Sequence, residues 1–588
     1  MLINVFVFVF RDSNSNSFSF DFFGDDKIDW HDYAFIAYEK NRTGPGEQGR
    51  PIVLTDPVEL AENEKGYKLE GIYTVVNDKI DNQRSLPDIR LPVCKTRKYL
   101  KKLPSTSVIV IFYNENWKLL MRCLHSIYNR TPHKLLKEII LVSDKSTDEK
   151  LGEPLKAYIK EHFSDKVKFF INEARKGLIV TRMEGARKAT GEVIVFLDSH
   201  IEVNVNWLPP LLEPIAENHK TAVVPIFDSF SPYTLEYQTL GHGARGSFDW
   251  TLCYQWLLLT RKYQKTPGDV YQLSAMTGGA YAINREYFFE LGGYDEGLIV
   301  WNGENYELSF KLHLCGGNLV QVPCSRVSHT TKHRTEYREQ NYNVDFSKYN
   351  LKRVAEVWLD EYKEALYRTD PKTYYKLDPG DLTKALEVKK RLQCKPFKYY
   401  LEVIAPDLFD HFPPFDKPNF ASGAIFSEAN PSKCITYVGP TPDSPTKLTE
   451  CSQNLTYPNE NQYFDFTWHR FIKYHAWTEK KMCIDTVAVN MYTCHFDFGN
   501  QFWKFDLKTH QLINPPSVRC ITSDDNYEKL FMSPCNEFDM HQKFNWGSVD
   551  VLALANWETE GVKIRDDRKK NEVADIIRAD GPSDKESE

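Results

Sequence analysis

The segment Asp198-Ser199-His200 places a carboxylate and an imidazole two residues apart, directly after the apolar run Val193–Leu197. If that run is a buried strand, both side chains can face one crevice and bind a divalent metal ion. Such an ion would neutralise the charge of a departing diphosphate. An isolated Asp-x-His also occurs without a metal, with the Asp capping a turn, so the surrounding elements have to decide between the two.

The elements that would position this pair alternate between strand and helix. Ser107–Phe112 is rich in β-branched residues, and apolar side chains then repeat at helical spacing from Trp117 to Ile127. Further strands are expected at 138–142, 167–171 and 193–197, and further helices at 156–162 and 181–189. This order predicts an α/β fold with a parallel sheet and helices on both faces, in which ligands bind beyond the carboxyl ends of the strands. Asp144 follows one of these strands and Asp198 another.

The C-terminal part of the chain has a different pattern, with six of the 12 cysteines in three close pairs. The pairs are Cys434/Cys451, Cys483/Cys494 and Cys520/Cys535, followed by Gln462-Tyr463-Phe464, Gln501-Phe502-Trp503 and Gln542-Lys543-Phe544. Three repeats of roughly 40 residues indicate a three-fold all-β unit. Because the chain has no Cys-x-x-Cys, zinc ribbons and thioredoxin-type redox sites are not supported. Close pairs of this kind favour disulfides and an oxidising compartment.

Composition excludes several classes of protein. Lys and Arg number 74 against 81 Asp and Glu in 588 residues, and the net charge of −7 gives no indication of nucleic-acid binding. Hydrophobic residues make up 41%, which is enough for full-sized cores. The run nearest to a membrane span, Leu2–Phe10, is about half the roughly 20 residues that a membrane-spanning helix needs, and Asn4 interrupts it. The sequons at Asn41, Asn129 and Asn454 are compatible with the secretory pathway.

The two ends of the chain look poorly ordered. Residues 1–60 are polar and aromatic, with Ser-Asn repeats and a Gly-Pro-Gly stretch, and we expect a stem or lead-in segment there. Residues 558–588 are mostly charged, which predicts a disordered, solvated tail.

Several motifs occur in the same order and spacing as in the polypeptide N-acetylgalactosaminyltransferases, which the chain resembles over about residues 44–548. They are Arg84-Ser85-Leu86-Pro87-Asp88, Gly177-Leu178-Ile179, Asp198-Ser199-His200, Trp301-Asn302-Gly303-Glu304-Asn305, Cys315-Gly316-Gly317 and Leu392-Gln393-Cys394-Lys395-Pro396-Phe397. The resemblance implies a GT-A (Rossmann-like) catalytic domain at 61–400, with subdomain A at about 103–214 and subdomain B at about 270–332. A linker at 401–420 and a ricin B-type β-trefoil lectin domain at 421–549 would follow.

The resemblance also implies an activity. The expected enzyme is a retaining glycosyltransferase that moves GalNAc from UDP-GalNAc to Ser or Thr hydroxyls of acceptor peptides and glycopeptides, initiating mucin-type O-glycosylation. Mn²⁺ is the expected cofactor. The Golgi is the expected location, although the type II membrane anchor typical of the family is not recognisable in this N-terminus.

Site residues follow from the same resemblance, position by position. The Mn²⁺ ligands would be Asp198, His200 and His329. The substrate-binding residues would be Asp144, Arg175, Trp301, Lys332 and Tyr337, and the catalytic ones Glu304, Glu307 and Trp301. In the lectin only the second repeat keeps a sugar-binding set, Asp485, His495 and Asn500, because Thr436 and Thr522 replace the Asp in the other two repeats. The resemblance adds the disulfides Cys94–Cys324 and Cys315–Cys394, which leaves Cys123 and Cys253 as thiols.

Four positions depart from the family pattern. Ser143 replaces an acid, Val180 an Arg, Asn302 a Gly and Lys332 an Arg. A Lys keeps the charge of an Arg but loses the planar fork that binds phosphate at two points. These changes keep a second hypothesis open: a catalytically weak relative that acts as a glycopeptide-binding lectin or partner protein. Without the resemblance, His329 could equally be an ordinary loop histidine, and Trp301 and Tyr337 ordinary core or surface aromatics.

Overall fold

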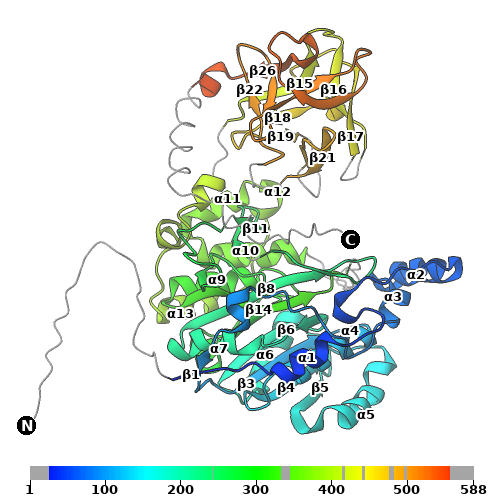
Figure 1. The fold of residues 1–588 in the computed structure, drawn as a ribbon. Helices are drawn as coiled ribbons and strands as arrows, with labels where there is room; N and C mark the ends of the chain where they lie inside the picture. Colours follow the sequence, from blue (N-terminus) through cyan, green and yellow to red (C-terminus); the bar gives the residue numbers. More distant parts are fainter. Residues whose placement is uncertain are drawn as a thin grey trace, which may run out of the picture.

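The computed structural model describes residues 26–241, 243–257, 259–332, 345–412, 418–439, 444–475, 482–494 and 499–555. Figure 1 shows two units, an α/β unit coloured blue to yellow-green and an all-β unit coloured yellow to red. Leu2–Phe10, the charged tail, Tyr337 and His495 lie outside the described residues. Among the described helices, none combines the length and the apolar character needed to cross a bilayer.

The α/β unit is built on a sheet with the strand order β12-β14-β8-β13-β6-β3-β4-β5, with β7 beside β14 and β9 beside β8. These strands are β3 (Thr106–Phe112), β4 (Leu136–Ser143), β5 (Val167–Ile171), β6 (Val193–Asp198), β7 (Ile201–Val203), β8 (Thr221–Phe230), β9 (Tyr237–Gln238), β12 (Tyr271–Gln272), β13 (Ala280–Asn284) and β14 (Asn318–His329). The four strands expected from the sequence are parallel neighbours. A strand that the sequence pattern did not indicate, β13, enters antiparallel between β6 and β8.

Helices cover both faces of this sheet, as the alternation of apolar side chains requires. On β3, Val108 and Val110 belong to one buried cluster together with residues of α4, α5 and α7, whereas Ile109 and Ile111 belong to another with residues of α6, α8, α9 and α10. The helices are α4 (Trp117–Arg130), α5 (Glu153–His162), α6 (Leu178–Lys188), α7 (Leu208–Glu217), α8 (Arg285–Glu290), α9 (Glu304–Leu314) and α10 (Phe346–Trp358). The hairpin β10 (Arg245–Phe248) and β11 (Tyr254–Leu257) and the helices α11 (Lys363–Tyr367), α12 (Pro371–Tyr374) and α13 (Thr383–Arg391) complete this half.

The N-terminal stem expected at 1–60 is not a stem from residue 26 onward. β1 (Lys27–Ile28) pairs with β2 (Tyr99–Leu100), and α1 (Tyr33–Lys40) and α2 (Pro57–Glu70) follow. The buried Glu39 of α1 forms an ion pair with Arg130 at the end of α4. The polar composition of this segment suggested disorder. Its folding could not be predicted from composition, because the residues that hold it against the α/β unit, such as Arg130, lie far away in sequence.

The linker expected at 401–420 is likewise folded through Phe412. The π-helical turn η7 (Tyr400–Ile404) and α15 (Leu408–His411) contribute buried side chains to the α/β core, and the indole Nε1 of Trp250 donates to the carbonyl of Phe412 at 2.7 Å. His411 contacts the second unit through a hydrogen bond with His469. The chain between the two units is therefore anchored on both sides at this point.

The second unit runs from β15 (Ala421–Ser427) to β26 (Phe544–Val549) and is a β-trefoil. The strands between them are β16 (Lys433–Tyr437), β17 (Ser444–Glu450), β18 (Phe464–Phe466), β19 (Ile472–Tyr474), β20 (Met482–Ile484), β21 (Asn490–Thr493), β22 (Lys504–Phe505), β23 (Leu512–Asn514), β24 (Arg519–Ser523) and β25 (Leu530–Pro534). The three repeated glutamines make equivalent hydrogen bonds. Nε2 of Gln462, Gln501 and Gln542 donates to the carbonyl that directly precedes the second cysteine of its own repeat, at 2.8, 3.1 and 2.9 Å. The repeated Gln is therefore part of the framework of each repeat.

Five disulfides link the pairs predicted from the sequence. They are Cys94–Cys324, Cys315–Cys394, Cys434–Cys451, Cys483–Cys494 and Cys520–Cys535. Cys123 and Cys253 are outside these bridges, and Cys123 is fully buried.

Candidate metal and donor site

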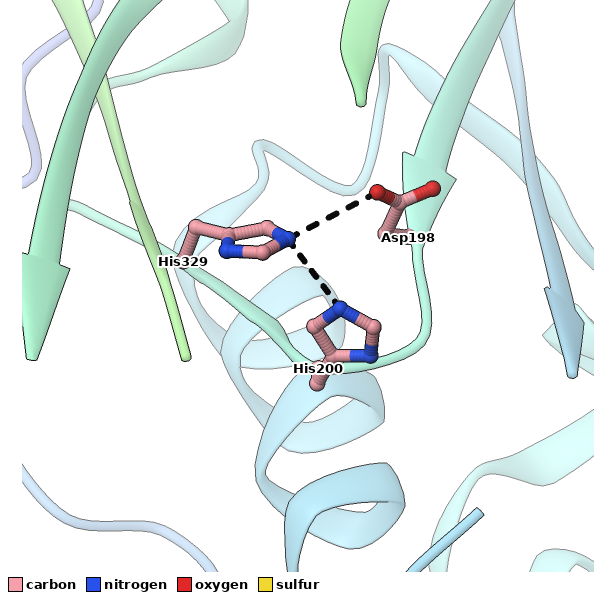
Figure 2. Close-up of side chains that lie close together, drawn as sticks. All are labelled: Asp198, His200 and His329. Carbon is pink, nitrogen blue, oxygen red and sulfur yellow. Dashed lines mark hydrogen bonds and ion pairs between the residues drawn. The ribbon is translucent and has the colours of Figure 1, made fainter. Parts of the chain in front are cut away.

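Asp198, His200 and His329 come together at one edge of the sheet (Figure 2). Nε2 of His329 lies 3.1 Å from Nε2 of His200 and 3.7 Å from Oδ2 of Asp198. One ligand atom from each residue falls within 4.8 Å of the others. Two imidazole nitrogens and one carboxylate oxygen that converge in this way form a donor set that a divalent ion of borderline character can occupy.

Strand pairing brings His329 to the other two ligands. Asp198 ends β6, and His200 precedes β7, which pairs antiparallel with the last residues of β14. In that register His329 stands opposite Ile201, and the amide of Thr330 donates to the carbonyl of His200 at 3.1 Å. His329, the third residue of the candidate triad, thus lies on a strand that begins more than one hundred residues later in the chain.

Glu115, which nothing in the sequence singled out, contacts His200 at Nδ1, the ring nitrogen other than the one that faces His329. Its Oε2 accepts hydrogen bonds from Nδ1 of His200 at 2.9 Å and from the hydroxyl of Ser199 at 2.8 Å. Its Oε1 accepts from Nζ of Lys332 at 3.0 Å. A carboxylate on Nδ1 leaves the lone pair of Nε2 directed at the site, which is the arrangement that orients histidine ligands in metalloproteins.

The pKa shifts of Asp198 and His329 favour the forms in which they could bind a metal ion, and Glu115 is kept ionised. Burial would raise the pKa of the Glu115 carboxyl, but the charges of Lys332 and His200 hold that pKa far below its usual range. Burial likewise opposes ionisation of Asp198, yet the neighbouring His329 and the charge of Arg182 keep its pKa below the ordinary value. Burial lowers the pKa of His329, although Asp198 acts in the opposite direction. The neutral imidazole that metal binding requires is therefore favoured.

Arg182 connects the metal ligands to Glu304. Its guanidinium is buried, with one nitrogen 2.8 Å from Oδ1 of Asp198 and another 3.8 Å from Oε1 of Glu304. Burial raises the pKa of Glu304, against the opposing charge of Arg182. Arg182 is the second Arg of the motif that Val180 alters, and Val180 itself, two residues earlier in α6, is half-buried.

Glu307 is not brought into this group. It lies one turn further along α9, buried, and forms an ion pair with Lys311, whose Nζ also donates to the carbonyl of Gly293 at 2.7 Å. Burial raises the pKa of Glu307 to about 7. The contacts given for Glu307 are thus with Lys311 in the protein interior, and its expected place near the transferred sugar stays a prediction.

Asp144 fixes the loop that precedes α6. Its Oδ1 accepts from the amide of Lys176 at 2.9 Å and its Oδ2 from the amide of Gly177 at 2.8 Å. The guanidinium of Arg175, the residue before this pair, stacks on the ring of Tyr113 at 3.5 Å. Asp144 thus has both carboxylate oxygens engaged by backbone amides, and Arg175 lies on the same loop.

Two further departures from the family pattern have local explanations. The hydroxyl of Ser143 makes a hydrogen bond with that of Ser146 at 3.0 Å. Asn302 has a φ of 80°, a left-handed conformation suited to the Gly usual at this position, and its Nδ2 donates to the hydroxyl of Ser347 at 2.6 Å. Asn tolerates such a φ better than other non-glycine residues do.

In the trefoil, Asp485 and Asn500 are brought together. The buried Oδ2 of Asp485 accepts from Nδ2 of Asn500 at 2.5 Å, and its Oδ1 accepts from the amide of Val487 at 2.9 Å. In the other repeats the equivalent position is a threonine bonded to a neighbouring hydroxyl, Thr436 to Thr449 at 2.7 Å and Thr522 to Ser533 at 2.6 Å. Among the three repeats, the second has the carboxylate that a sugar hydroxyl could use.

Fold and site together define a GT-A glycosyltransferase joined to a ricin-type lectin, and comparisons with known proteins agree. Residues 107–292 match the model "Glycosyl transferase family 2", residues 265–337 "N-terminal domain of galactosyltransferase", and residues 421–544 "Ricin-type beta-trefoil lectin domain".

Curated relatives match most of the chain. N-acetylgalactosaminyltransferase 4 of Drosophila melanogaster is 40% identical over 539 residues, covering 90% of this chain and 83% of its own length. Human polypeptide N-acetylgalactosaminyltransferase 10 is 40% identical over 538 residues, which cover 90% of this chain and 87% of the human protein. A crystal structure of GalNAc-T7 with UDP, GalNAc and Mn²⁺ superimposes with a TM-score of 0.62 at 35% identity, covering 86% of this chain and 93% of that one. The chain belongs to the polypeptide N-acetylgalactosaminyltransferase family.

Proposed function

We propose that this enzyme transfers GalNAc from UDP-GalNAc to Ser and Thr hydroxyls of polypeptides, with Mn²⁺ bound by Asp198, His200 and His329. The observation that carries the proposal is the convergence of these three ligands at the carboxyl edge of the sheet, within the fold of this transferase family. The crystal structure of GalNAc-T7 with UDP, GalNAc and Mn²⁺ supports the same ligand classes.

The residues of the triad suit this ion. Two nitrogens and one oxygen leave coordination positions for other oxygen ligands, such as those of a diphosphate. When bound, Mn²⁺ supplies positive charge that offsets the charge of a leaving diphosphate. Glu115 holds His200 in the required tautomer, and Arg182 holds Asp198.

The remaining residues orient the donor and stabilise charge. Lys332 is held by Glu115 at the edge of the triad, and Arg175 lies on the loop fixed by Asp144, so both can contribute positive charge to a diphosphate. Asp144 and Trp301 are proposed to contact the nucleotide and the donor, and Glu304 to lie beside the transferred sugar. We propose that the diphosphate itself accepts the proton of the attacking hydroxyl, so that the anomeric configuration is retained without a dedicated base. A trapped glycosyl-enzyme on Glu304 would contradict this mechanism.

The test is a transfer assay with UDP-GalNAc, a Ser/Thr-containing peptide and Mn²⁺. We expect transfer that EDTA abolishes and excess Mn²⁺ restores, and a loss of at least 100-fold in His200→Ala. His219→Ala is the matched control, because His219 lies in the loop between α7 and β8, on another part of the sheet. Near-full transfer by His200→Ala in EDTA would contradict the metal site.

The alternative, a catalytically weak relative that acts as a glycopeptide-binding lectin or partner protein, would show little transfer or hydrolysis of UDP-GalNAc while still binding GalNAc-bearing peptides. Residence in the lumen of the secretory pathway, with the Golgi as the expected station, is supported by the five disulfides and by the family. Immunolocalisation against Golgi markers tests it.

A further inference from the structure

The loop that carries Trp301 has an unusual backbone. Val300 has a φ of 57°, Asn302 of 80° and Gly303 of 92°, so three of the four residues from 300 to 303 are left-handed. This region is unfavourable for L-residues and most so for a β-branched residue such as Val. Such conformations persist only where the surrounding structure fixes them, and they cluster at functional sites.

One side chain makes most of the contacts that fix this loop. Asn350 of α10 has no exposed surface. Its Nδ2 lies 2.7 Å from the carbonyl of Ile299, 3.0 Å from that of Trp301 and 2.8 Å from that of Asn302. Its Oδ1 accepts from the amide of Ile299 at 2.9 Å. A single amide group thus engages four backbone groups of the loop.

The opposite side of the loop rests on the start of α6. The amide of Leu178 donates to the carbonyl of Val300 at 2.8 Å. A Cβ added to Gly177 would lie 2.8 Å from Cα of Val300, so a side chain at position 177 would displace the loop. Gly177 is itself held by Asp144 through its amide. The loop is therefore clamped between α10 and the segment that Asp144 fixes.

The hydrogen bonds from Asn350 and Leu178 engage the backbone of the loop, and the Trp301 side chain remains partly exposed. Val300 is 1% exposed, whereas Trp301 is 44% exposed. The backbone that carries the Trp301 side chain is thus fixed by the hydrogen bonds with Asn350 and Leu178. The side chain of Asn302, bonded to Ser347 at 2.6 Å, adds a second contact between the loop and α10.

We propose that Asn350 is a positioning residue for Trp301. It holds the strained loop so that the indole stands where the donor binds, and it links α10 to the Asp144 side of the donor site. This inference rests on the proposed function only in taking Trp301 as a donor contact. The donor is the nucleotide sugar of the proposed reaction.

The experiment uses the full chain with Asn350→Asp and Asn350→Ala. Asn350→Asp keeps the shape and the acceptor for Ile299 but cannot donate to the three carbonyls. We expect kcat/KM for UDP-GalNAc to fall about 10- to 100-fold, since a displacement of about 1 Å in a positioned group can cost that much. The KM for UDP-GalNAc should rise and the KM for peptide should stay unchanged. Ser347→Ala, which removes only the contact with Asn302, should raise the KM for UDP-GalNAc less than Asn350→Asp does.

Asn204→Ala is the matched control. Asn204 is equally buried and also donates to a carbonyl, that of Pro87 at 2.9 Å. It should lower the melting temperature as Asn350→Ala does, without raising the KM for UDP-GalNAc.

A double-mutant cycle with Trp301→Ala separates positioning from stability. If Asn350 acts through Trp301, Asn350→Ala should change kcat/KM less than twofold once Trp301 is already Ala. If the losses in kcat/KM of Asn350→Ala and Trp301→Ala multiplied in the double variant, the inference would be overturned. An unchanged KM for UDP-GalNAc in Asn350→Asp and Ser347→Ala would also overturn it. No effect of Trp301→Ala alone would instead contradict the proposed role of Trp301.

Discussion

Nδ1 of His200 lies 2.9 Å from the carboxylate of Glu115, and that carboxylate is almost completely buried. As a carboxylate, Glu115 can accept a hydrogen bond from Nδ1 of His200, and in the neutral tautomer with Nδ1–H the lone pair of Nε2 is free for a metal ion. Nε2 is the atom that faces His329. One carboxylate outside the triad of candidate ligands therefore orients His200 and connects it to Lys332 through hydrogen bonds.

Removing this carboxylate should weaken metal binding while the triad itself stays intact. We expect Glu115→Ala to lower the affinity for Mn²⁺ by about 10- to 100-fold, because histidine ligands that lose such a partner lose both orientation and basicity. Mn²⁺ titration followed by electron paramagnetic resonance measures this directly. Glu115→Gln, whose amide oxygen can still accept a hydrogen bond from Nδ1 of His200, should have an affinity for Mn²⁺ between those of the native enzyme and Glu115→Ala.

The matched control is Glu138→Gln. Glu138 is also a buried carboxylate that binds a hydroxyl, that of Ser107 at 2.8 Å, and a lysine, Lys168, but it lies at the start of β4. Equal losses of Mn²⁺ affinity in Glu115→Gln and Glu138→Gln would show that general destabilisation, and not orientation of His200, is responsible.

Glu307 should make stability depend on pH. Its pKa is about 7 in the folded chain against an ordinary value of 4.5, so the folded state binds more protons than the unfolded state between these values. Its contribution to stability is full below about pH 4.5 and is lost as the pH rises through 7, on the order of 1–3 kcal/mol in total. In Glu307→Gln this part of the decline should be missing from denaturant unfolding measured from pH 5 to 8.

Glu402 provides the control for this measurement. It pairs with Lys398 at the same i, i+4 spacing, but both side chains are more than half exposed. Glu402→Gln should leave the pH profile of stability unchanged. A profile for Glu307→Gln that parallels the native one would refute the assignment.

The trefoil should matter only for substrates that already bear a sugar. We expect Asp485→Ala to reduce activity on GalNAc-bearing glycopeptides about 10-fold and to leave activity on unmodified peptides nearly unchanged, because a weak second site acts by raising local concentration. Thr522→Ala, at the equivalent position of the third repeat, is the control and should change neither activity. Equal losses on both substrates would show that Asp485 has a structural role.

The two cysteines outside the disulfides should react differently. Cys253 is exposed and Cys123 is fully buried in the cluster between α4 and the sheet. Maleimide should modify Cys253 in the native enzyme and Cys123 only after unfolding, as peptide mapping would show, and Cys253→Ser should remove the native reaction. Modification of Cys123 in the folded enzyme would indicate local opening of α4.

The elements that depend on short-range pattern were predictable. Short apolar runs rich in β-branched residues located β3, β4, β5 and β6, and close cysteine spacing located the trefoil pairs. These features need only neighbouring residues, since a strand or a repeat imposes its own period. The resemblance to a known family added His329 and the two long-range disulfides, which no spacing rule reaches.

Tertiary structure alone decided the contacts made by residues without a local signature. Glu115, Arg182 and Asn350 lie on or before helices whose sequences reveal nothing of their partners, and the buried packing of residues 26–60 depends on charges such as Arg130 in distant elements. The antiparallel entry of β13 and the inward direction of Glu307 belong to the same group. Sequence determines periodicity and chemistry along the chain, whereas a buried polar group finds its partner only when folding brings distant strands and helices together.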